Sequence, residues 1–67
     1  MNNHEIECRH MTAEELSETI RSSPEYDSDA LAALCWMADM EEAWSEATGE
    51  DFEAVAMEAA DKLGVEI

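Results

Sequence analysis

Apolar residues recur every three or four positions over most of the chain, which is the spacing of one face of an α-helix. The first such run begins at Thr12, which forms a capping box with Glu15. It ends before Pro24, because the residue before a proline avoids the helical region. Its apolar face consists of Ala13, Leu16 and Ile20. The pattern therefore predicts a first helix over residues 12–23.

A second helix is predicted from Asp27 or Ser28, either of which can cap its start, to about Thr48. Gly49 supplies a left-handed residue beyond its end. The first half of this helix is apolar on two sides, and such a helix lies at the centre of a fold. We therefore expect it to pack between its two neighbours. Its narrow apolar stripe consists of Ala33, Met37, Met40, Trp44 and Ala47.

A third helix is predicted to begin at Glu50 or Asp51 and to end at Gly64. Lys62 lies in its last turn, where the helix dipole favours a cation. Its apolar stripe consists of Phe52, Val55, Ala56, Ala59 and Leu63. Neither an internal repeat nor a linker interrupts the sequence, so we expect residues 1–67 to form a single domain.

The two ends of the chain alternate apolar with polar residues, as a β-strand does. Ile6 and Cys8 are flanked by charged residues, and residues 65–67 alternate in the same way. We therefore expect a short N-terminal strand that can pair with the C-terminal tail. The fold class predicted from the whole pattern is mostly α, a compact three-helix domain to which this strand pair can be added.

Charge is the most unusual property of the sequence, with 18 acidic residues against three basic ones and a formal net charge of −15. Direct binding of nucleic acid requires a basic patch, and an anionic membrane surface repels such a chain, so both functions are excluded. The charge is also unevenly placed, because no lysine or arginine lies between Arg21 and Lys62. This distribution predicts an anionic surface on the second and third helices.

The candidate partner-binding residues lie on this surface. Asp39, Glu42 and Glu46 share the helix face opposite the apolar stripe and rise by about 4.5 and 6 Å along it. These intervals are comparable with those of phosphates along a nucleic-acid strand. Trp36 projects off the stripe, either into the core or as an exposed anchor, since indoles are enriched at interface hot spots. The predicted set is Asp39, Glu42, Glu46, Glu50, Asp51, Glu53 and Trp36.

No metal, cofactor or catalytic site is predicted. Zinc-ligand residue types occur near the N-terminus, but their spacing matches no usual zinc pattern. Asp27 and Asp29 could begin a calcium loop, but the turn position of that loop lacks its glycine. Carboxylates are plentiful, yet no nucleophile with a base and an orienting group can be placed. The zinc-ligand types in question are His4, Cys8 and His10, which Cys35 could join.

The chain is expected to be cytoplasmic. Its first residues lack the basic and apolar regions of a secretory signal, and Cys8 and Cys35 are then expected to be reduced thiols. The longest apolar run is the nine residues 30–38, whereas a membrane span needs about 20 residues. A soluble protein of the cytosol is therefore predicted.

Asp27 and Ser28 open an acidic helix that continues with Leu31, Leu34 and Met37. Together with residues 41–44, Glu-Glu-Ala-Trp, this segment resembles the Asp-Ser-Leu segment and second helix of acyl carrier proteins. In that family the serine bears a phosphopantetheine arm, which the resemblance places on Ser28. It implies a carrier or adaptor domain that binds a protein partner through its central helix.

Small size, strong negative charge and a single-domain layout resemble those of phage-encoded anti-CRISPR proteins, several of which mimic DNA. This resemblance implies an inhibitor of a CRISPR–Cas complex. We also expect the chain to be a monomer without enzyme activity or a cofactor. Its acidic surface would occupy the surface of a CRISPR–Cas surveillance complex that recognises the PAM or the target DNA. Another basic nucleic-acid-binding protein of the host could equally be the partner, since other DNA mimics share these features.

Overall fold

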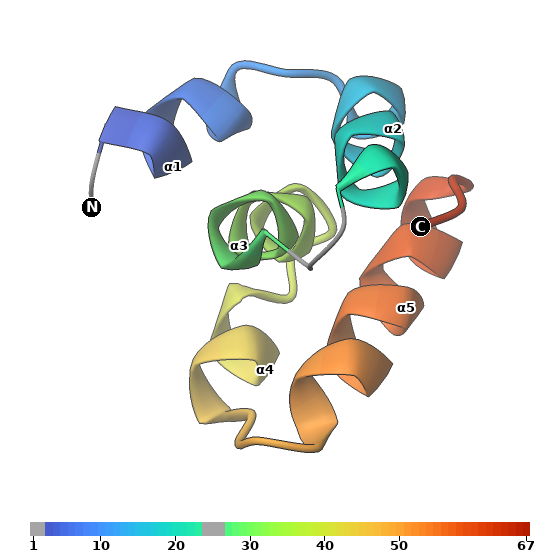
Figure 1. Cartoon of the computed structure of the whole chain (residues 1–67). Helices are drawn as coiled ribbons and strands as arrows, with labels where there is room; N and C mark the ends of the chain where they lie inside the picture. The colour runs from blue at the N-terminus through green and yellow to red at the C-terminus, as the bar shows by residue number, and fades with distance from the viewer. Residues whose placement is uncertain (1–2, 24–26) are drawn as a thin grey trace.

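The computed structural model describes residues 3–23 and 27–67, and within them the chain forms five α-helices and no strand (Figure 1). None of these helices is long and apolar enough to cross a membrane. The mostly helical class is confirmed, whereas the number of helices is higher than predicted. The helices are α1 (Asn3–Arg9), α2 (Ala13–Ser22), α3 (Ser28–Met37), α4 (Glu41–Glu46) and α5 (Asp51–Leu63).

Helix α3 lies at the centre of the molecule, and each of the other four helices packs against it (Figure 1). Its position agrees with the two-sided apolar pattern of its sequence. Leu34 is fully buried beside the equally buried Leu16 of α2, and burial of each side chain contributes about 1.5–3 kcal/mol. The buried residues of α3 are Ala30, Leu31, Ala33, Leu34 and Cys35.

Helix α2 begins with the predicted capping box. The amide of Glu15 donates to Thr12 Oγ1 at 3.1 Å, and the amide of Thr12 donates to Glu15 Oε1 at 3.2 Å. Ile20 is buried on the predicted apolar face, and the helix gives way to extended backbone at Ser23. Pro24, to which we assigned this ending, lies outside the described residues.

The predicted second helix is wrong beyond Met37, because the chain leaves the helix there and α4 begins only at Glu41. Asp39 adopts a left-handed backbone with φ of 60°. Its amide donates to the Trp36 carbonyl at 3.2 Å, and the Met40 amide donates to the Cys35 carbonyl at 2.7 Å. This is the bonding of a Schellman ending, which glycine usually provides. Burial of Met40 against Cys35 accompanies this turn.

The predicted N-terminal strand is also wrong, because the segment forms the helix α1. Two apolar residues are too few to distinguish the period of a strand from that of a helix, and α1 packs against α3. Cys8 is buried in the core, while Ile6, which the strand would have placed on the same face, is 41% exposed. At the other end, residues 65–67 form no strand, and Val65 and Ile67 pack against the core as irregular backbone.

Helix α5 agrees with its prediction at both ends. It begins at Asp51 and ends before Gly64, which has φ of 73° and allows the Val65 amide to reach the Ala60 carbonyl at 3.0 Å. Its start lies against α4, where the rings of Trp44 and Phe52 are 4.9 Å apart at 53°. Two consecutive helices, α4 and α5, thus pack against each other as a helical hairpin.

Candidate functional site

The predicted acidic residues lie on α4, on the first turn of α5 and in the two turns beside α4 (Figure 1). We call residues 39–53 the acidic hairpin. This stretch contains no lysine or arginine, and all seven of its carboxylates are exposed. These residues are Asp39, Glu41, Glu42, Glu46, Glu50, Asp51 and Glu53.

The row of carboxylates expected along one long helix is not formed. Asp39 belongs to the turn after α3, so only Glu42 and Glu46 share a helix, one turn apart on α4. Glu50 and Asp51 follow around the turn that leads into α5. The structure therefore gathers the predicted residues on one hairpin, but it spreads them over two helices and two turns.

Aromatic packing holds the hairpin together. Trp44 is partly buried and contacts the apolar residues of both core clusters, while Phe52 lies against its ring. Beside them opens a cavity of about 340 Å³, whose lining includes Leu31 of α3 and Ala56 of α5. Trp44 is partly buried and Phe52 is 37% exposed, so it is the contact between the two rings and the packing of Trp44 on the core that oppose repulsion among the carboxylates.

Trp36 belongs to α3, outside the acidic hairpin, and is 41% exposed. The guanidinium of Arg9 lies 4.7 Å from the centroid of its ring, and the same group donates to Glu41 Oε1 at 3.1 Å. Glu5 Oε1 lies 3.7 Å from the same terminal nitrogen of Arg9. Trp36 therefore supports a cation that links α1 to α4, a role that spacing along the sequence did not reveal.

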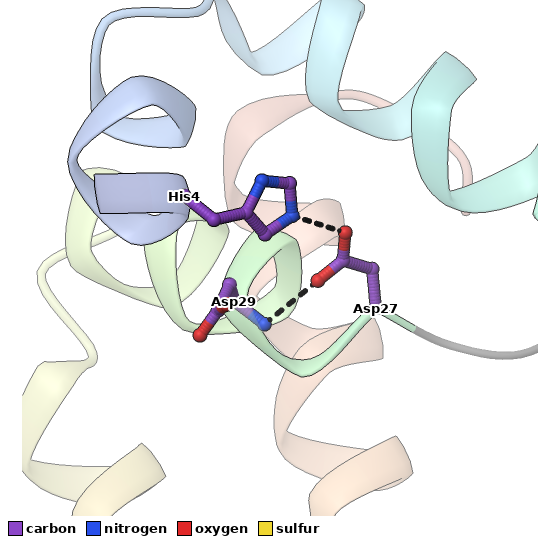
Figure 2. A group of neighbouring side chains, drawn as sticks. All are labelled: His4, Asp27 and Asp29. Carbon is purple, nitrogen blue, oxygen red and sulfur yellow. Dashed lines mark hydrogen bonds and ion pairs between the residues drawn. The ribbon is translucent and has the colours of Figure 1, made fainter. Parts of the chain in front are cut away.

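A second group of polar side chains lies where α1 meets the start of α3 (Figure 2). We call His4, Cys8, Asp27 and Asp29 the His4 cluster. His4 Nε2 and Asp27 Oδ2 are 2.6 Å apart, and Cys8 Sγ lies 4.0 Å from the same nitrogen. Sequence reasoning paired His4 with Cys8 and Asp27 with Asp29, but 23 residues separate His4 from Asp27, and no pattern in the sequence joins them.

Electrostatics within the His4 cluster favour an ion pair. The hydrogen bond with Asp27 and the charge of that carboxylate raise the pKa of His4. Burial disfavours the charged form of Asp27, but hydrogen bonds from His4 and from the amides of Ala30 and Asp29 outweigh it, so its pKa is lowered. Burial, reinforced by the nearby carboxylates, raises the pKa of the Cys8 thiol.

The two cysteines are both buried thiols, as expected for reduced residues, but they have different surroundings. Cys35 is fully buried between Met40 and Ala59, and this burial raises its pKa to about 11. Cys8 belongs to the other core cluster, and its Sγ also lies 4.0 Å from His4 Nε2. Cys35, which sequence reasoning allowed as a partner of the N-terminal zinc-ligand types, therefore belongs to the apolar core.

Ser28, the residue to which the acyl carrier resemblance assigns a prosthetic arm, is exposed in the first turn of α3. It also contributes to the lining of the apolar cavity beside Trp44 and Phe52. A group attached to this hydroxyl would therefore begin at the edge of an apolar space.

The chain matches no protein-family model, no curated protein and no solved structure. The acidic hairpin can attract a cationic partner, the His4 cluster brings together nitrogen, oxygen and sulfur donors, and Ser28 offers a hydroxyl beside a cavity.

Proposed function

We propose that the protein is a non-enzymatic inhibitor that presents the acidic hairpin to the basic groove of a nucleic-acid-binding protein. The observation that carries this proposal is the exposure of seven carboxylates on residues 39–53, a stretch without any lysine or arginine. Ordinary helix surfaces carry both acidic and basic residues, because neighbouring opposite charges stabilise a helix slightly and neighbouring like charges destabilise it. A surface whose own stretch of chain has no basic residue is suited to a strongly cationic partner.

The proposed mechanism is competition for the groove. Lysine and arginine side chains that contact phosphates in a nucleic-acid complex would contact carboxylates of the hairpin instead. The field of a chain with a net charge of −15 accelerates the encounter, and binding should weaken steeply as salt is added. The carboxylates lie on two helices and two turns, so the mimicry would follow a surface and not a single straight strand.

A CRISPR–Cas surveillance complex is the first target that we would test. The resemblance to small acidic anti-CRISPR proteins favours this class, and the surface that recognises the PAM or the target DNA is rich in the required basic groups. Other basic nucleic-acid-binding proteins fit the same chemistry. In each case the inhibitor needs neither a cofactor nor a catalytic residue.

The decisive experiment removes charge from the hairpin while the control removes the same charge elsewhere. The test variant carries Glu42→Gln, Glu46→Gln, Glu50→Gln and Asp51→Asn. The control variant carries four equivalent changes at exposed residues outside the hairpin, with the same loss of negative charge. These control changes are Glu14→Gln, Glu18→Gln, Glu58→Gln and Asp61→Asn.

Both variants are added to a surveillance complex bound to fluorescent target DNA, and displacement of the DNA is followed by anisotropy. We expect the test variant to lose at least tenfold in inhibitory potency and the control variant to lose much less, because contact charges count more than distant ones. Equal potency of the two variants would show that only net charge matters, and the hairpin would not be the binding surface.

A second candidate is favoured by one observation, namely that exposed Ser28 lines the apolar cavity of about 340 Å³. We propose as the alternative function a carrier domain in which a phosphopantetheine arm on Ser28 would lead an acyl group toward that cavity. Incubation with coenzyme A and a phosphopantetheinyl transferase, followed by mass spectrometry, tests it. A carrier gains the mass of the arm and Ser28→Ala does not, whereas an unchanged mass of the natural chain eliminates this candidate.

A further inference from the structure

The His4 cluster brings residues of α1 next to residues at the start of α3, and His4, Asp27 and Asp29 are seen together in Figure 2. His4 Nε2, a carboxylate oxygen of Asp27 and a carboxylate oxygen of Asp29 all lie within 4.8 Å of one another. Cys8 lies one turn after His4 on α1, and its Sγ is 4.0 Å from His4 Nε2. Imidazole, carboxylate and thiol groups that approach so closely form a mixed set of metal-binding donors.

Two of these separations can be compared with those of a tetrahedral zinc site. Zinc bonds of about 2.0–2.3 Å place the donor atoms of such a site roughly 3.3–3.6 Å apart. The contact of 2.6 Å between His4 and Asp27 would have to open, while the distance of 4.0 Å to Cys8 would have to close slightly. Both changes are shorter than one bond length. Cys8 Sγ lies outside the group of donor atoms that are within 4.8 Å of one another, so its side chain would also have to turn toward the two carboxylates.

The orientation of Asp27 is fixed independently of His4. Its Oδ1 caps α3 by accepting hydrogen bonds from the amides of Asp29 at 3.0 Å and Ala30 at 3.3 Å. These bonds leave Oδ2 directed at His4 Nε2 (Figure 2). Ligands in protein metal sites are commonly held by such outer hydrogen bonds, which set both their direction and their basicity.

The donor types select the metal. Calcium and magnesium prefer oxygen ligands only, whereas a histidine nitrogen and a cysteine sulfur favour zinc and similar transition metals. Acidic residues alone, which are abundant on this chain, would not make that distinction. In the described part of the chain, His4, Asp27 and Asp29 lie within 4.8 Å of one another and Cys8 Sγ lies 4.0 Å from His4 Nε2, and these donor types are suited to Zn²⁺.

We propose that His4, Asp27 and Asp29 bind one Zn²⁺ ion, with Cys8 as the fourth ligand. Coordination replaces the hydrogen bond between His4 and Asp27, and the proton of that bond and the thiol proton pass to solvent. The ion would join α1 to the start of α3 across 23 residues of sequence. Since α1 has only seven residues and cannot persist alone, the ion would stabilise its position in the fold. This role is independent of the acidic hairpin.

The experiment is a titration of the chelator-treated full chain with Co²⁺, which takes the place of Zn²⁺ and reports its ligands by absorption. The expected complex has one ion per chain, the intense visible bands of tetrahedral cobalt and a near-ultraviolet band from a cobalt–thiolate bond. Addition of Zn²⁺ should remove all of these bands. In parallel, Zn²⁺ should raise the melting temperature of the chain by several degrees, because it binds only the folded state.

Three variants test the ligands. His4→Gln and Asp27→Asn should each weaken Co²⁺ binding at least tenfold, and Cys8→Ser should remove the near-ultraviolet band. Asparagine caps helices as well as aspartate does, so Asp27→Asn keeps the fold even if another variant loses it. The controls are His10→Gln and Asp51→Asn, which remove an exposed imidazole and an exposed carboxylate outside the cluster and should bind Co²⁺ as the natural chain does.

Several outcomes would overturn the site. Weak binding of many ions, with equal affinity in Asp27→Asn and Asp51→Asn, would mean that the metal binds non-specifically to the acidic surface. Absence of saturable Co²⁺ and Zn²⁺ binding would exclude the site directly. A saturable complex without the thiolate band would overturn the assignment of Cys8 as a ligand.

Discussion

The acidic hairpin and the contact between α1 and α3 differ in how their carboxylates are paired with cations. Around α1, acids meet cations, since Asp27 pairs with His4, and Arg9 lies between Glu5 and Glu41. The hairpin carries seven exposed carboxylates on a stretch of chain without a basic residue, and one of them, Glu41, is the partner of Arg9. Ion pairs therefore help to hold α1 against the rest of the fold. On the hairpin, most of the carboxylates are exposed to solvent and their mutual repulsion lowers stability.

The two regions are consequently held by different forces. Helix α1 is too short to be stable alone, and it depends on burial of Cys8 together with polar contacts from His4 and Arg9. The hairpin depends on the contact between Trp44 and Phe52. Mutations should separate these two forces, because the hairpin should respond most to loss of apolar area and α1 to loss of a charge.

The largest expected effect is that of Trp44→Ala. Trp44 contacts both core clusters and the ring of Phe52, so its truncation should lower the free energy of unfolding by about 3 kcal/mol. Urea denaturation followed by circular dichroism measures the change. The control is Met57→Ala, which removes an exposed apolar side chain from α5 and should cost less than about 0.5 kcal/mol. Similar losses in both variants would contradict the role given to the aromatic contact.

The next effect is a loss of stability at alkaline pH, which we expect from the buried thiol of Cys35. The pKa of Cys35 is about 11 in the fold because the thiol is buried, and it is 9.0 ordinarily. The unfolded chain therefore loses this proton first, so stability is intact below pH 9 and falls as the pH rises toward 11. The fall should be on the order of 1–2 kcal/mol.

Denaturation of the natural chain and of Cys35→Ala at pH 8 and pH 10.5 measures this contribution. The variant should be less stable at pH 8, where it lacks buried sulfur, and should lose less stability between the two values. Cys8 contributes a slope of the same sign in both proteins, since its pKa is also raised. An unchanged slope in Cys35→Ala would show that the thiolate of Cys35 is tolerated in the core.

A smaller effect is expected at α1, from Arg9→Met. The change removes the guanidinium from the ring of Trp36 and from Glu41, while the methionine keeps most of the apolar stem. Cation–π contacts and exposed ion pairs each contribute about 0.5–1 kcal/mol, so a total loss of about 1 kcal/mol is expected. Arg9 Nε is buried without a hydrogen-bond partner among the described residues, and its removal offsets part of the loss.

The matched control for Arg9→Met is Arg21→Met, because Arg21 is exposed at the end of α2. Both changes make the net charge more negative by one, so the difference between them isolates the contacts of Arg9. We expect Arg21→Met to change stability by less than about 0.5 kcal/mol. An equal effect of the two substitutions, measured by urea denaturation, would mean that α1 is held by burial and not by its charges.

Helix ends that are formed by common capping residues could be predicted from the sequence. The remaining helix ends depend on tertiary contacts and could not. The capping box at Thr12 and the ending at Gly64 were both predicted correctly, because each is specified within a few residues. The break at Asp39 was missed, since an aspartate there replaces the usual glycine and only burial of Met40 favours the turn. The His4 cluster was missed for a similar reason, because its residues meet only after α1 has packed against α3.

The smallest effect should come from Asp39→Gly, at the turn that begins the hairpin. Asp39 holds φ of 60°, which costs a residue with a side chain about 1–2 kcal/mol, while glycine loses somewhat more entropy on folding. The net result should be a gain of about 0.5–1 kcal/mol, measured by urea denaturation. Asp39→Asn tolerates the left-handed region as well as aspartate does, so it separates loss of charge from relief of the backbone. If Asp39→Asn stabilises the chain as much as Asp39→Gly, repulsion among the hairpin carboxylates outweighs backbone strain at this turn.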